Sequence, residues 1–267
     1  MSPLRYAAGT MPVDAPKKIL LTGASTGIGL VIARQLLDAG HEVWAASRQP
    51  PNLPGIHPVK VDLLSTTIGA ALRDVPAVDV LINNAGAGLF GASEELPEVD
   101  VRAQFQLLFY APLQLIQWAL PAMRARRAGR IINITSLAAV LPVPFMAPYN
   151  AAKAALSAST TSLRLELAGT GIQVIEIQPA DINTGFHHST KKIGTAGQSA
   201  WETQQRNMAA APGPECVARA VLGAIQAPHP APVMVVGGFF QAQLAPLGAR
   251  LLPRRLLTAL LRRYYRL

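Results

Sequence analysis

The sequence predicts a single α/β domain whose parallel sheet is covered by helices on both faces. Short apolar runs of strand length alternate with longer helical stretches along most of the chain, and this alternation is typical of parallel sheets. A glycine-rich turn joins the first apolar run directly to the first helix. The 267 residues, half of them apolar and 15% charged, are enough to bury one large core.

The apolar runs place the elements along the chain. Strands are expected at 19–21, 42–46, 59–61, 78–82, 131–135, 173–177 and 233–236. Helices are expected at 30–39, 101–124 and 215–227, and 160–167 continues a further helix. These elements define one domain over 17–240, with a flexible tail at 1–16 and a basic amphipathic extension at 241–267. The polar stretch 185–214 lacks periodicity, which is typical of a lid over a substrate site.

The turn after the first strand has the pattern of a dinucleotide-binding loop. It runs Thr22-Gly-Ala-Ser-Thr-Gly-Ile-Gly29 and opens the first helix. Glycines let the backbone approach a pyrophosphate, and the helix N-terminus offers free N–H groups to its charge. The candidate cofactor-binding residues in this turn are Gly23, Ser25, Thr26, Gly27, Ile28 and Gly29. A tight turn whose glycines serve only packing is the alternative interpretation.

The second strand ends in Ser47 and Arg48, without the acid that bonds the ribose 2′-hydroxyl in NAD sites. An arginine here can pair with the 2′-phosphate of NADP(H), so we expect that cofactor. The alternative is a loop arginine in solvent. Asp62 and Leu63 follow the third strand, where they would reach the adenine.

Ser136, Tyr149 and Lys153 form the candidate catalytic group. If one helix carries Tyr149 and Lys153, their i, i+4 spacing puts both side chains on one face. The ammonium would then lower the pKa of the phenol, which could exchange a proton with a carbonyl or alcohol oxygen. Ser136 would hold that same oxygen. The alternative is a buried tyrosine and a solvated lysine on an ordinary amphipathic helix.

Charge and composition limit the kinds of ligand and partner that we expect this chain to bind. The net charge is +9, but the stretch from Arg250 to Leu267 holds six arginines and no acid, so the other 249 residues carry about +3. We therefore expect no nucleic-acid surface. His187 and His188 have no further ligand residues at metal spacing nearby, so we expect no metal. The single Cys216 excludes an internal disulfide and fits a cytoplasmic location.

The C-terminal extension predicts an amphipathic helix that begins at Pro253. Its apolar side gathers Leu256, Leu257, Leu260, Leu261, Tyr264 and Leu267, and its polar side gathers Arg254, Arg255, Thr258, Arg262, Arg263 and Arg266. A basic amphipathic helix can lie at an anionic membrane surface, which would make the protein peripheral there. The alternative is packing on the domain or on a partner subunit. Such a tail beside a lid suits a lipid, a steroid or a long-chain ketone.

Taken in order, these motifs resemble the short-chain dehydrogenase/reductase family over about 17–238. The residues that carry the resemblance are Thr22-Gly-x-x-x-Gly-x-Gly29, Asn83-Asn-Ala-Gly86, Ser136, Tyr149-x-x-x-Lys153 and 179–184. The resemblance implies a Rossmann-type doubly wound sheet of seven parallel strands, a nicotinamide cofactor, and hydride transfer between that cofactor and a carbonyl or alcohol carbon. It implies that Tyr149 is the general acid/base and that Ser136 positions the substrate oxygen. Lys153 would lower the pKa of the tyrosine and bind the nicotinamide ribose.

The resemblance also completes the expected cofactor site. It adds Asn84, Ala85, Gly86, Tyr149, Lys153, Pro179, Ala180, Ile182 and Thr184 as cofactor-binding candidates. Ile182 and Thr184 match the positions that meet the carboxamide and the phosphates. The helix at 101–124 matches the family's usual dimer surface, so we expect a homodimer or homotetramer.

Two positions depart from the family pattern. Leu108 stands 28 residues before Ser136, where the family usually has an asparagine that helps hold a water linking the lysine to solvent. Ala180 replaces the usual glycine after the proline, which a negative φ would accommodate. A catalytically impaired cofactor-binding regulatory or scaffold protein is therefore an alternative. A sugar-nucleotide epimerase or dehydratase is disfavoured by the glycine spacing.

The expected function is therefore NADP(H)-dependent oxidoreduction. The protein would interconvert a ketone and a secondary alcohol on a hydrophobic small molecule of lipid, steroid or long-chain type.

Overall fold

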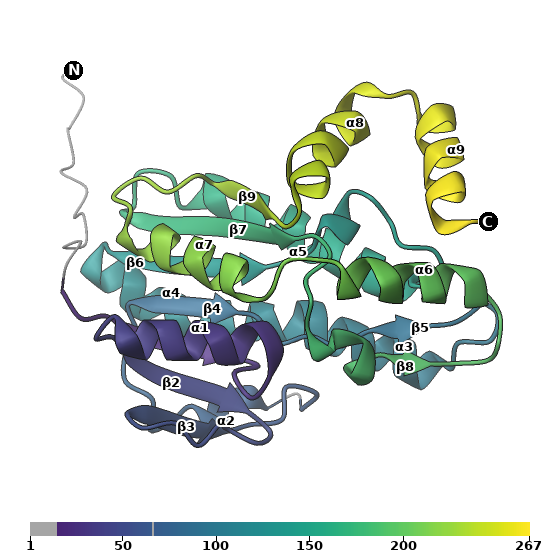
Figure 1. Cartoon of the computed structure of the whole chain (residues 1–267). Helices are drawn as coiled ribbons and strands as arrows, with labels where there is room; N and C mark the ends of the chain where they lie inside the picture. Colours follow the sequence, from purple (N-terminus) through teal and green to yellow (C-terminus); the bar gives the residue numbers. More distant parts are fainter. Residues whose placement is uncertain (1–14, 66) are drawn as a thin grey trace.

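The predicted seven-stranded, doubly wound parallel sheet is confirmed (Figure 1). The computed structural model describes residues 15–65 and 67–267, so the predicted tail at 1–16 lies almost entirely outside the described residues. The strands run parallel in the order β3-β2-β1-β4-β6-β7-β9. They are β1 (Lys18–Thr22), β2 (Glu42–Ser47), β3 (Ile56–Lys60), β4 (Val80–Asn83), β6 (Gly129–Ile134), β7 (Ile172–Pro179) and β9 (Val233–Val236). The order reverses between β1 and β4, and ligands of open α/β sheets bind at such a switch point.

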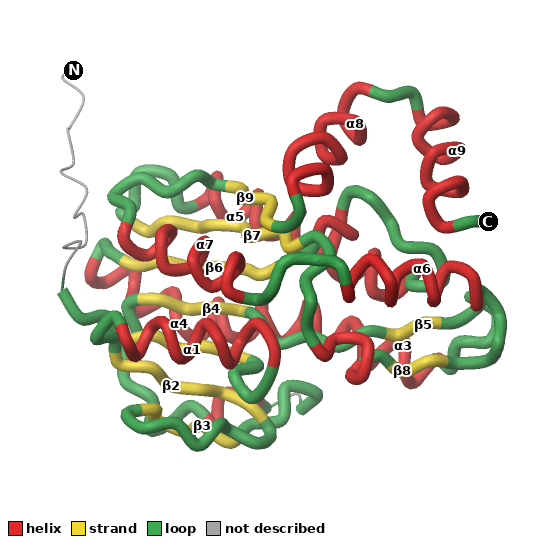
Figure 2. The backbone as a smooth tube through the Cα atoms, in the orientation of Figure 1, coloured by secondary structure: helices red, strands yellow, loops and turns green. Residues whose placement is uncertain are grey.

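Helices cover both faces of the sheet because successive side chains of a strand point to opposite sides. Ile19 and Leu21 of β1 pack in one core layer with α1 (Gly27–Asp38) and α7 (Glu215–Gln226). Leu20 packs in the other layer, with α2 (Ile68–Ala71), α4 (Ala111–Arg126) and the end of α5 (Ala147–Glu166). Figure 2 shows the strands between these helices. Burial on both faces explains why the inner strands β1, β2 and β4 are almost uninterrupted apolar runs.

The helix predicted at 101–124 is continuous but has an irregular turn in its middle. α3 (Glu98–Phe105) leads into a π-helical turn, η1 (Gln106–Tyr110), and then into α4. Such turns are frequent at functional sites. The helix predicted at 160–167 extends back to Ala147, so α5 carries both Tyr149 and Lys153.

The stretch 185–214 is more regular than predicted. It contains η3 (Gly185–Ser189), β8 (Lys191–Lys192) and α6 (Gln198–Ala209). β8 pairs with β5 (Leu89–Phe90) in a second, two-stranded sheet. Trp201 of α6 meets Phe90 with ring centroids 4.9 Å apart. Strands of two residues and contacts across a hundred residues leave no periodic signal, so the sequence did not reveal these elements, and the lid role of the stretch stays a prediction.

The predicted C-terminal helix is present and belongs to a longer arm. We call residues 240–267 the C-terminal arm; it comprises η4 (Phe240–Leu244), α8 (Ala245–Leu251) and α9 (Arg254–Tyr265). Figure 1 shows α8 rising from the end of β9 and α9 returning toward α6. The inward seam of α9 is formed by Leu257 and Leu261, which are half-buried, and by Tyr265, which is only 8% exposed. The rest of the predicted apolar stripe is exposed, so packing on the domain accounts for only part of it.

Candidate active site

A cavity of about 1730 Å³ lies along the carboxyl ends of the central strands. Every predicted site residue lines it: Gly23, Ser25, Thr26, Gly27, Ile28, Gly29, Ser47, Arg48, Asp62, Leu63, Asn84, Ala85, Gly86, Ser136, Tyr149, Lys153, Pro179, Ala180, Ile182 and Thr184. They come from turns after β1, β2, β4, β6 and β7, from the stretch after β3, and from α5. The predicted residues are therefore brought together around one space.

Two glycines of the glycine-rich turn, Gly23 and Gly29, leave no room for a side chain. Gly23 has φ +69°, and a Cβ there would lie 2.7 Å from the Cα of Ala85. A Cβ on Gly29 would overlap the carbonyl oxygen of Gly23 and lie 2.5 Å from Nδ2 of Asn84. Backbone therefore approaches backbone at this turn, as a site that receives a pyrophosphate requires.

The turn after β4 is held against the glycine-rich turn by its own polar groups. Oγ1 of Thr22 accepts hydrogen bonds from the backbone N–H groups of Asn84 and Ala85, at 2.9 and 3.0 Å. Nδ2 of Asn84 donates to the carbonyl oxygens of Thr22 and Gly23, at 2.9 and 3.3 Å. The Asn84 side chain thus ties the two turns together and fixes the shape of the crevice between them.

The end of β2 contains an unsatisfied polar atom that fits a phosphate. Oγ of Ser47 is buried and forms no hydrogen bond within the described chain. Arg48 follows it, exposed, on the wall of the same cavity. A buried hydroxyl without a partner is unfavourable, and a phosphate oxygen beside Arg48 would supply one. Nearby, Oδ1 of Asp62, which also lines the cavity, accepts the backbone N–H of Leu64 at 3.0 Å.

The two remaining cofactor candidates on the β7 side are held by local structure. Oγ1 of Thr184 accepts the N–H of Phe186 at 3.3 Å and so caps η3. Ile182 is 3% exposed and its side chain belongs to the core layer of α1 and α7. Ala180 does not have a positive φ, so alanine can replace the family's usual glycine at this position without backbone strain.

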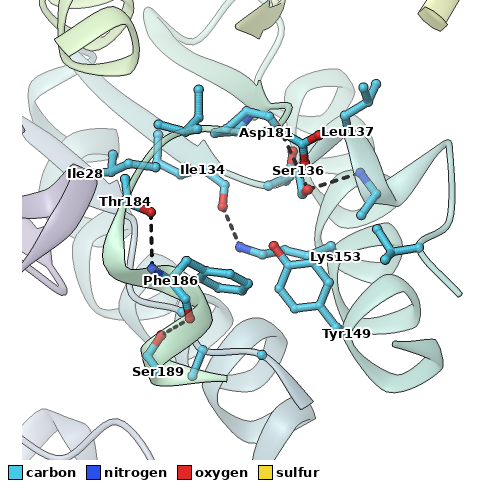
Figure 3. Close-up of a pocket in the computed structure, with 18 of the residues that line it drawn as sticks. Ile28, Ile134, Ser136, Leu137, Tyr149, Lys153, Asp181, Thr184, Phe186 and Ser189 are labelled. Carbon is cyan, nitrogen blue, oxygen red and sulfur yellow. Dashed lines mark hydrogen bonds between the residues drawn. The ribbon is translucent and has the colours of Figure 1, made fainter. Parts of the chain in front are cut away.

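Ser136, Tyr149 and Lys153 converge on one side of the cavity (Figure 3). Oγ of Ser136 accepts the N–H of Ala138 at 3.1 Å and donates to the carbonyl of Pro179 at 3.4 Å. Nζ of Lys153 donates to the carbonyl of Ile134 at 2.8 Å and lies 6.0 Å from the centroid of the Tyr149 ring. Three elements therefore position the group: the end of β6, the turn after β7, and α5.

The net shift of the Tyr149 pKa is upward, opposite to the predicted acidification. Burial raises the pKa of Tyr149 to about 12, with a smaller rise from the Asp181 charge, although the Ser136 side chain acts in the opposite direction. Burial also lowers the pKa of Lys153 to about 8. Both shifts have one cause, because burial disfavours the charged form of either group. The phenol is therefore protonated at neutral pH and suited to donate a proton.

Leu108 lies in the π-helical turn and is 1% exposed. A Cβ built on Gly86 would lie 3.4 Å from Cδ2 of Leu108 and 4.0 Å from Nζ of Lys153. Leu108 and the lysine thus flank the same glycine, and the leucine offers no hydrogen bond where the family pattern has an amide. The ammonium donates to the Ile134 carbonyl instead.

The sequence prediction missed that the C-terminal arm lines the cavity. Leu244, Leu252, Leu257, Leu261, Tyr264 and Tyr265 of the arm form part of the wall. Asp181 and Phe186 were also missed, and the Phe186 ring lies 5.6 Å from that of Tyr149. The i, i+4, i+8 spacing of Leu257, Leu261 and Tyr265 was the available signal for the inward seam.

The paired histidines lie side by side on η3. The rings of His187 and His188 are 3.9 Å apart. Within 15–65 and 67–267 there is no group of three or more His, Cys, Asp or Glu side chains suited to hold a metal ion.

The strand order and the glycine-lined switch point define the class: an α/β protein with the architecture of the dinucleotide-binding folds. Residues 17–193 match the model of the short chain dehydrogenase family. The chain therefore belongs to the short-chain dehydrogenase/reductase family.

Known proteins similar to this chain include the 3-ketodihydrosphingosine reductase of Bacteroides thetaiotaomicron. It is 36% identical over 190 residues, covering 69% of this chain and 71% of the reductase. A short chain dehydrogenase from Burkholderia cenocepacia in complex with NADP is 25% identical with a TM-score of 0.75, covering 94% of this chain and 99% of that one. A Burkholderia phymatum protein in complex with NAD, 24% identical, has the same fold with a TM-score of 0.78, covering 94% and 96%. Structural neighbours thus bind nicotinamide cofactors of both kinds.

Proposed function

We propose that this protein interconverts a ketone and a secondary alcohol with NADP(H), on a hydrophobic small molecule. The observation that carries the proposal is the convergence of Ser136, Tyr149 and Lys153 on a cavity that the glycine-rich turn also lines. A protonated phenol, a hydroxyl and an ammonium in one place suit the exchange of a proton with an oxygen.

The chain's own groups have distinct tasks in the reduction. Ser136 binds the carbonyl oxygen through its hydroxyl, and Tyr149 donates its proton to that oxygen as the alcohol forms. The cofactor, when bound, supplies the hydride that reduces the carbonyl carbon. Lys153 stabilises the phenolate left on Tyr149, because at neutral pH its ammonium is mostly charged despite its pKa of about 8. Solvent then returns the proton to the phenol.

NADP(H) is the proposed cofactor because of the end of β2. The fit rests on the buried, unpartnered hydroxyl of Ser47 and on the exposed guanidinium of Arg48 beside it. Gly23, Gly27 and Gly29 would lie against the pyrophosphate. An acid that would repel a 2′-phosphate is absent from the end of this strand.

An apolar substrate is proposed because side chains from three separate segments wall the cavity with hydrocarbon. They include Leu141, Phe186, Met208, Leu252, Leu257 and Leu261. The Bacteroides relative is named for reducing a ketone, 3-ketodihydrosphingosine, which supports the carbonyl chemistry.

The test is NADPH oxidation with a series of methyl ketones of increasing chain length, run in parallel with NADH. The rate constant kcat/KM should rise with chain length, since each buried methylene contributes about 0.8 kcal/mol. Equal rates for short and long ketones would contradict the proposed apolar specificity. Calorimetric binding of NADPH without any turnover would favour the alternative below.

A cofactor-binding protein without turnover is the second candidate, and Leu108 is the observation that favours it. The leucine places hydrocarbon beside Lys153 where the family pattern holds a water. Slow reprotonation of Tyr149 would follow. The variant Leu108→Asn separates the two cases, because it should raise the rate of a slow enzyme and leave a non-enzyme inactive.

We also propose that the arm touches an anionic membrane surface. Its exposed apolar side chains include Phe240, Leu244, Leu247, Leu251, Leu256, Leu260 and Leu267, and Phe239 directly before the arm is exposed as well. All six arginines of 250–267 are exposed as well, and no acid accompanies them. Apolar side chains flanked by uncompensated positive charge match a bilayer with negative head groups. Of the described residues, no helix has the length and apolar content needed to span a membrane.

Sedimentation with vesicles tests the membrane contact. Vesicles of phosphatidylcholine with phosphatidylglycerol should bind the protein, and pure phosphatidylcholine vesicles should bind it much less. Arg254→Gln combined with Arg255→Gln should weaken binding by about 2 kcal/mol, near 30-fold. Equal binding of wild type and variant, or no binding at all, would contradict the contact. A concentration-dependent dimer buried through Leu251 and Leu256 would also contradict it.

A homodimer through α3 and α4 is proposed on the family resemblance. Val99 and Tyr110 are large apolar side chains exposed on this helical segment, at 71% and 50%. Light scattering should give twice the chain mass, and Tyr110→Glu should shift it toward the monomer. An unchanged mass in that variant would place the interface elsewhere.

A further inference from the structure

Asp181 is a carboxylate in the cavity that the proposed chemistry leaves without a task. It lies two residues after the end of β7 and lines the cavity together with Ser136 and Tyr149. Figure 3 shows it next to Ser136, on the side toward which the Tyr149 hydroxyl points. Burial is the main cause of the raised pKa of Tyr149, Tyr264 and Tyr265, and the Asp181 charge adds to the rise in all three, so the carboxylate is electrostatically close to these phenols.

The neighbours of Asp181 provide its carboxylate with a hydrogen bond but not with an ion-pair partner among the described residues. Nε2 of Gln241 donates to its Oδ2 at 2.5 Å, and its backbone N–H donates to Oε1 of Gln241 at 3.3 Å. Arg263 also lines the cavity, and Lys153 is bound to a carbonyl. Within 15–65 and 67–267, no Lys, Arg or His side chain forms an ion pair with Asp181.

This environment is unfavourable for a free carboxylate. Leu244, Leu257 and Leu261 wall the same space, and one amide donor does not replace the water that a carboxylate loses. Burial raises the pKa of Asp181, against the smaller opposing effect of Gln241. A cation brought into the cavity would supply the missing partner and favour the ionised form.

We infer that Asp181 binds an ammonium group of the substrate, beside the carbonyl that Ser136 and Tyr149 hold. An ammonium that reaches Asp181 while the carbonyl oxygen stays at Ser136 is attached close to the carbonyl carbon. The apolar wall formed by the C-terminal arm then takes a hydrocarbon chain. The substrate class is a long-chain α-amino ketone, with the matching amino alcohol in the reverse direction. This inference rests on the proposed function, because that function places the carbonyl.

A matched pair of substrates tests the inference. The wild-type protein is assayed with NADPH on 2-amino-3-octadecanone and on 3-octadecanone, which differ only in the amine. The ratio of kcat/KM, amino ketone over plain ketone, should be about 10 to 100, the effect of one hydrogen-bonded charge pair. Asp181→Asn keeps the size of the side chain and should bring the ratio close to one. Asp181→Glu should retain part of the preference, and Asp74→Asn, which removes an exposed acid elsewhere, should leave it intact.

A purely structural role predicts another result. Asp181 and Gln241 join the β7 turn to the arm, and Gln241 also contacts the Tyr264 hydroxyl at 3.2 Å. If Asp181 served only this join, Asp181→Asn would lower both rates by the same factor and leave the ratio unchanged. That outcome would overturn the inference, as would a wild-type ratio near one.

A binding measurement keeps failure of the inference apart from failure of the proposed function. Calorimetry compares dodecylammonium with dodecanol on the full chain, without any need for turnover. Dodecylammonium should bind about 10-fold or more tightly, and Asp181→Asn should abolish the difference. If the wild-type protein shows this difference in binding but reduces no ketone, the ammonium site is supported and the proposed reaction is contradicted. Equal binding of the two amphiphiles would overturn the ammonium site itself.

Discussion

The nucleotide half of the cavity and its substrate half are built in different ways. In the nucleotide half, glycines bring backbone against backbone, and side chains such as Asn84 tie the turns to each other. In the substrate half, side chains from α5, η3, α6 and the C-terminal arm form the wall. The first half therefore tolerates no added atom at Gly23 or Gly29, whereas the second takes its specificity from the side chains that line it.

The most severe test of this contrast is Gly29→Ala. The new methyl group would overlap the Gly23 carbonyl and crowd Asn84, and neither neighbour is free to move. We expect a loss of about 3 kcal/mol or more in the free energy of unfolding, together with loss of NADPH binding. Urea denaturation and calorimetry measure the two effects. Gly69→Ala, where a Cβ meets nothing within 4 Å, is the control. Equal behaviour of the two variants would show that the close backbone approach is unimportant.

Lys153 belongs to the substrate half, and its burial predicts a pH effect. Its pKa is about 8 in the folded protein and near 10.5 when unfolded, so the unfolded chain binds the proton more tightly. The cost of burying the ammonium is full below pH 8 and disappears as the pH rises to 10.5. Wild type should therefore gain about 3 kcal/mol relative to Lys153→Met across this window. Urea denaturation of both proteins between pH 7.5 and 10.5 measures it; parallel curves would contradict a buried ammonium.

Arg48→Ala sharpens the account of the nucleotide half. The variant should weaken NADPH binding by about 2 kcal/mol, near 30-fold, because it removes one charge-assisted contact to phosphate. NADH binding should change little, since NADH has no 2′-phosphate. Calorimetry gives the ratio of the two affinities. A ratio that does not move would leave the preference for NADP(H) without its physical basis.

The smallest expected effect comes from Gly223 in α7, distant from both halves. A Cβ there meets nothing within 4 Å. Gly223→Ala should stabilise the protein by about 0.5–1 kcal/mol, because alanine loses less conformational freedom in a helix than glycine. Thermal unfolding measures the change. A loss of stability would mean that even an open helical position resists an added methyl group.

The fold was predictable from the sequence because its signals are local. Double burial makes β1, β2 and β4 apolar runs, and the glycine-rich turn marks the crevice between the first strand and helix. All the predicted site residues lie around one cavity because each follows a strand end or faces it from α5. What they do there is proposed and awaits the experiments above.

The remaining features depend on contacts between distant segments. The two-residue strands β5 and β8 exist only because they pair with each other, and α6 is held by Phe90. Tyr265 is buried because the arm returns to the cavity. The sign of the Tyr149 pKa shift was missed for the same reason, because a motif gives the neighbour at i+4 but not the burial of the ring.

The most direct measurement is kcat for ketone reduction by Tyr149→Phe, which removes one oxygen and its proton. If this phenol is the proton donor, kcat should fall by about 100- to 10,000-fold, while the exposed-ring control Tyr110→Phe keeps the wild-type rate. A Tyr149→Phe protein that folds normally and turns over within a few-fold of wild type would contradict the account.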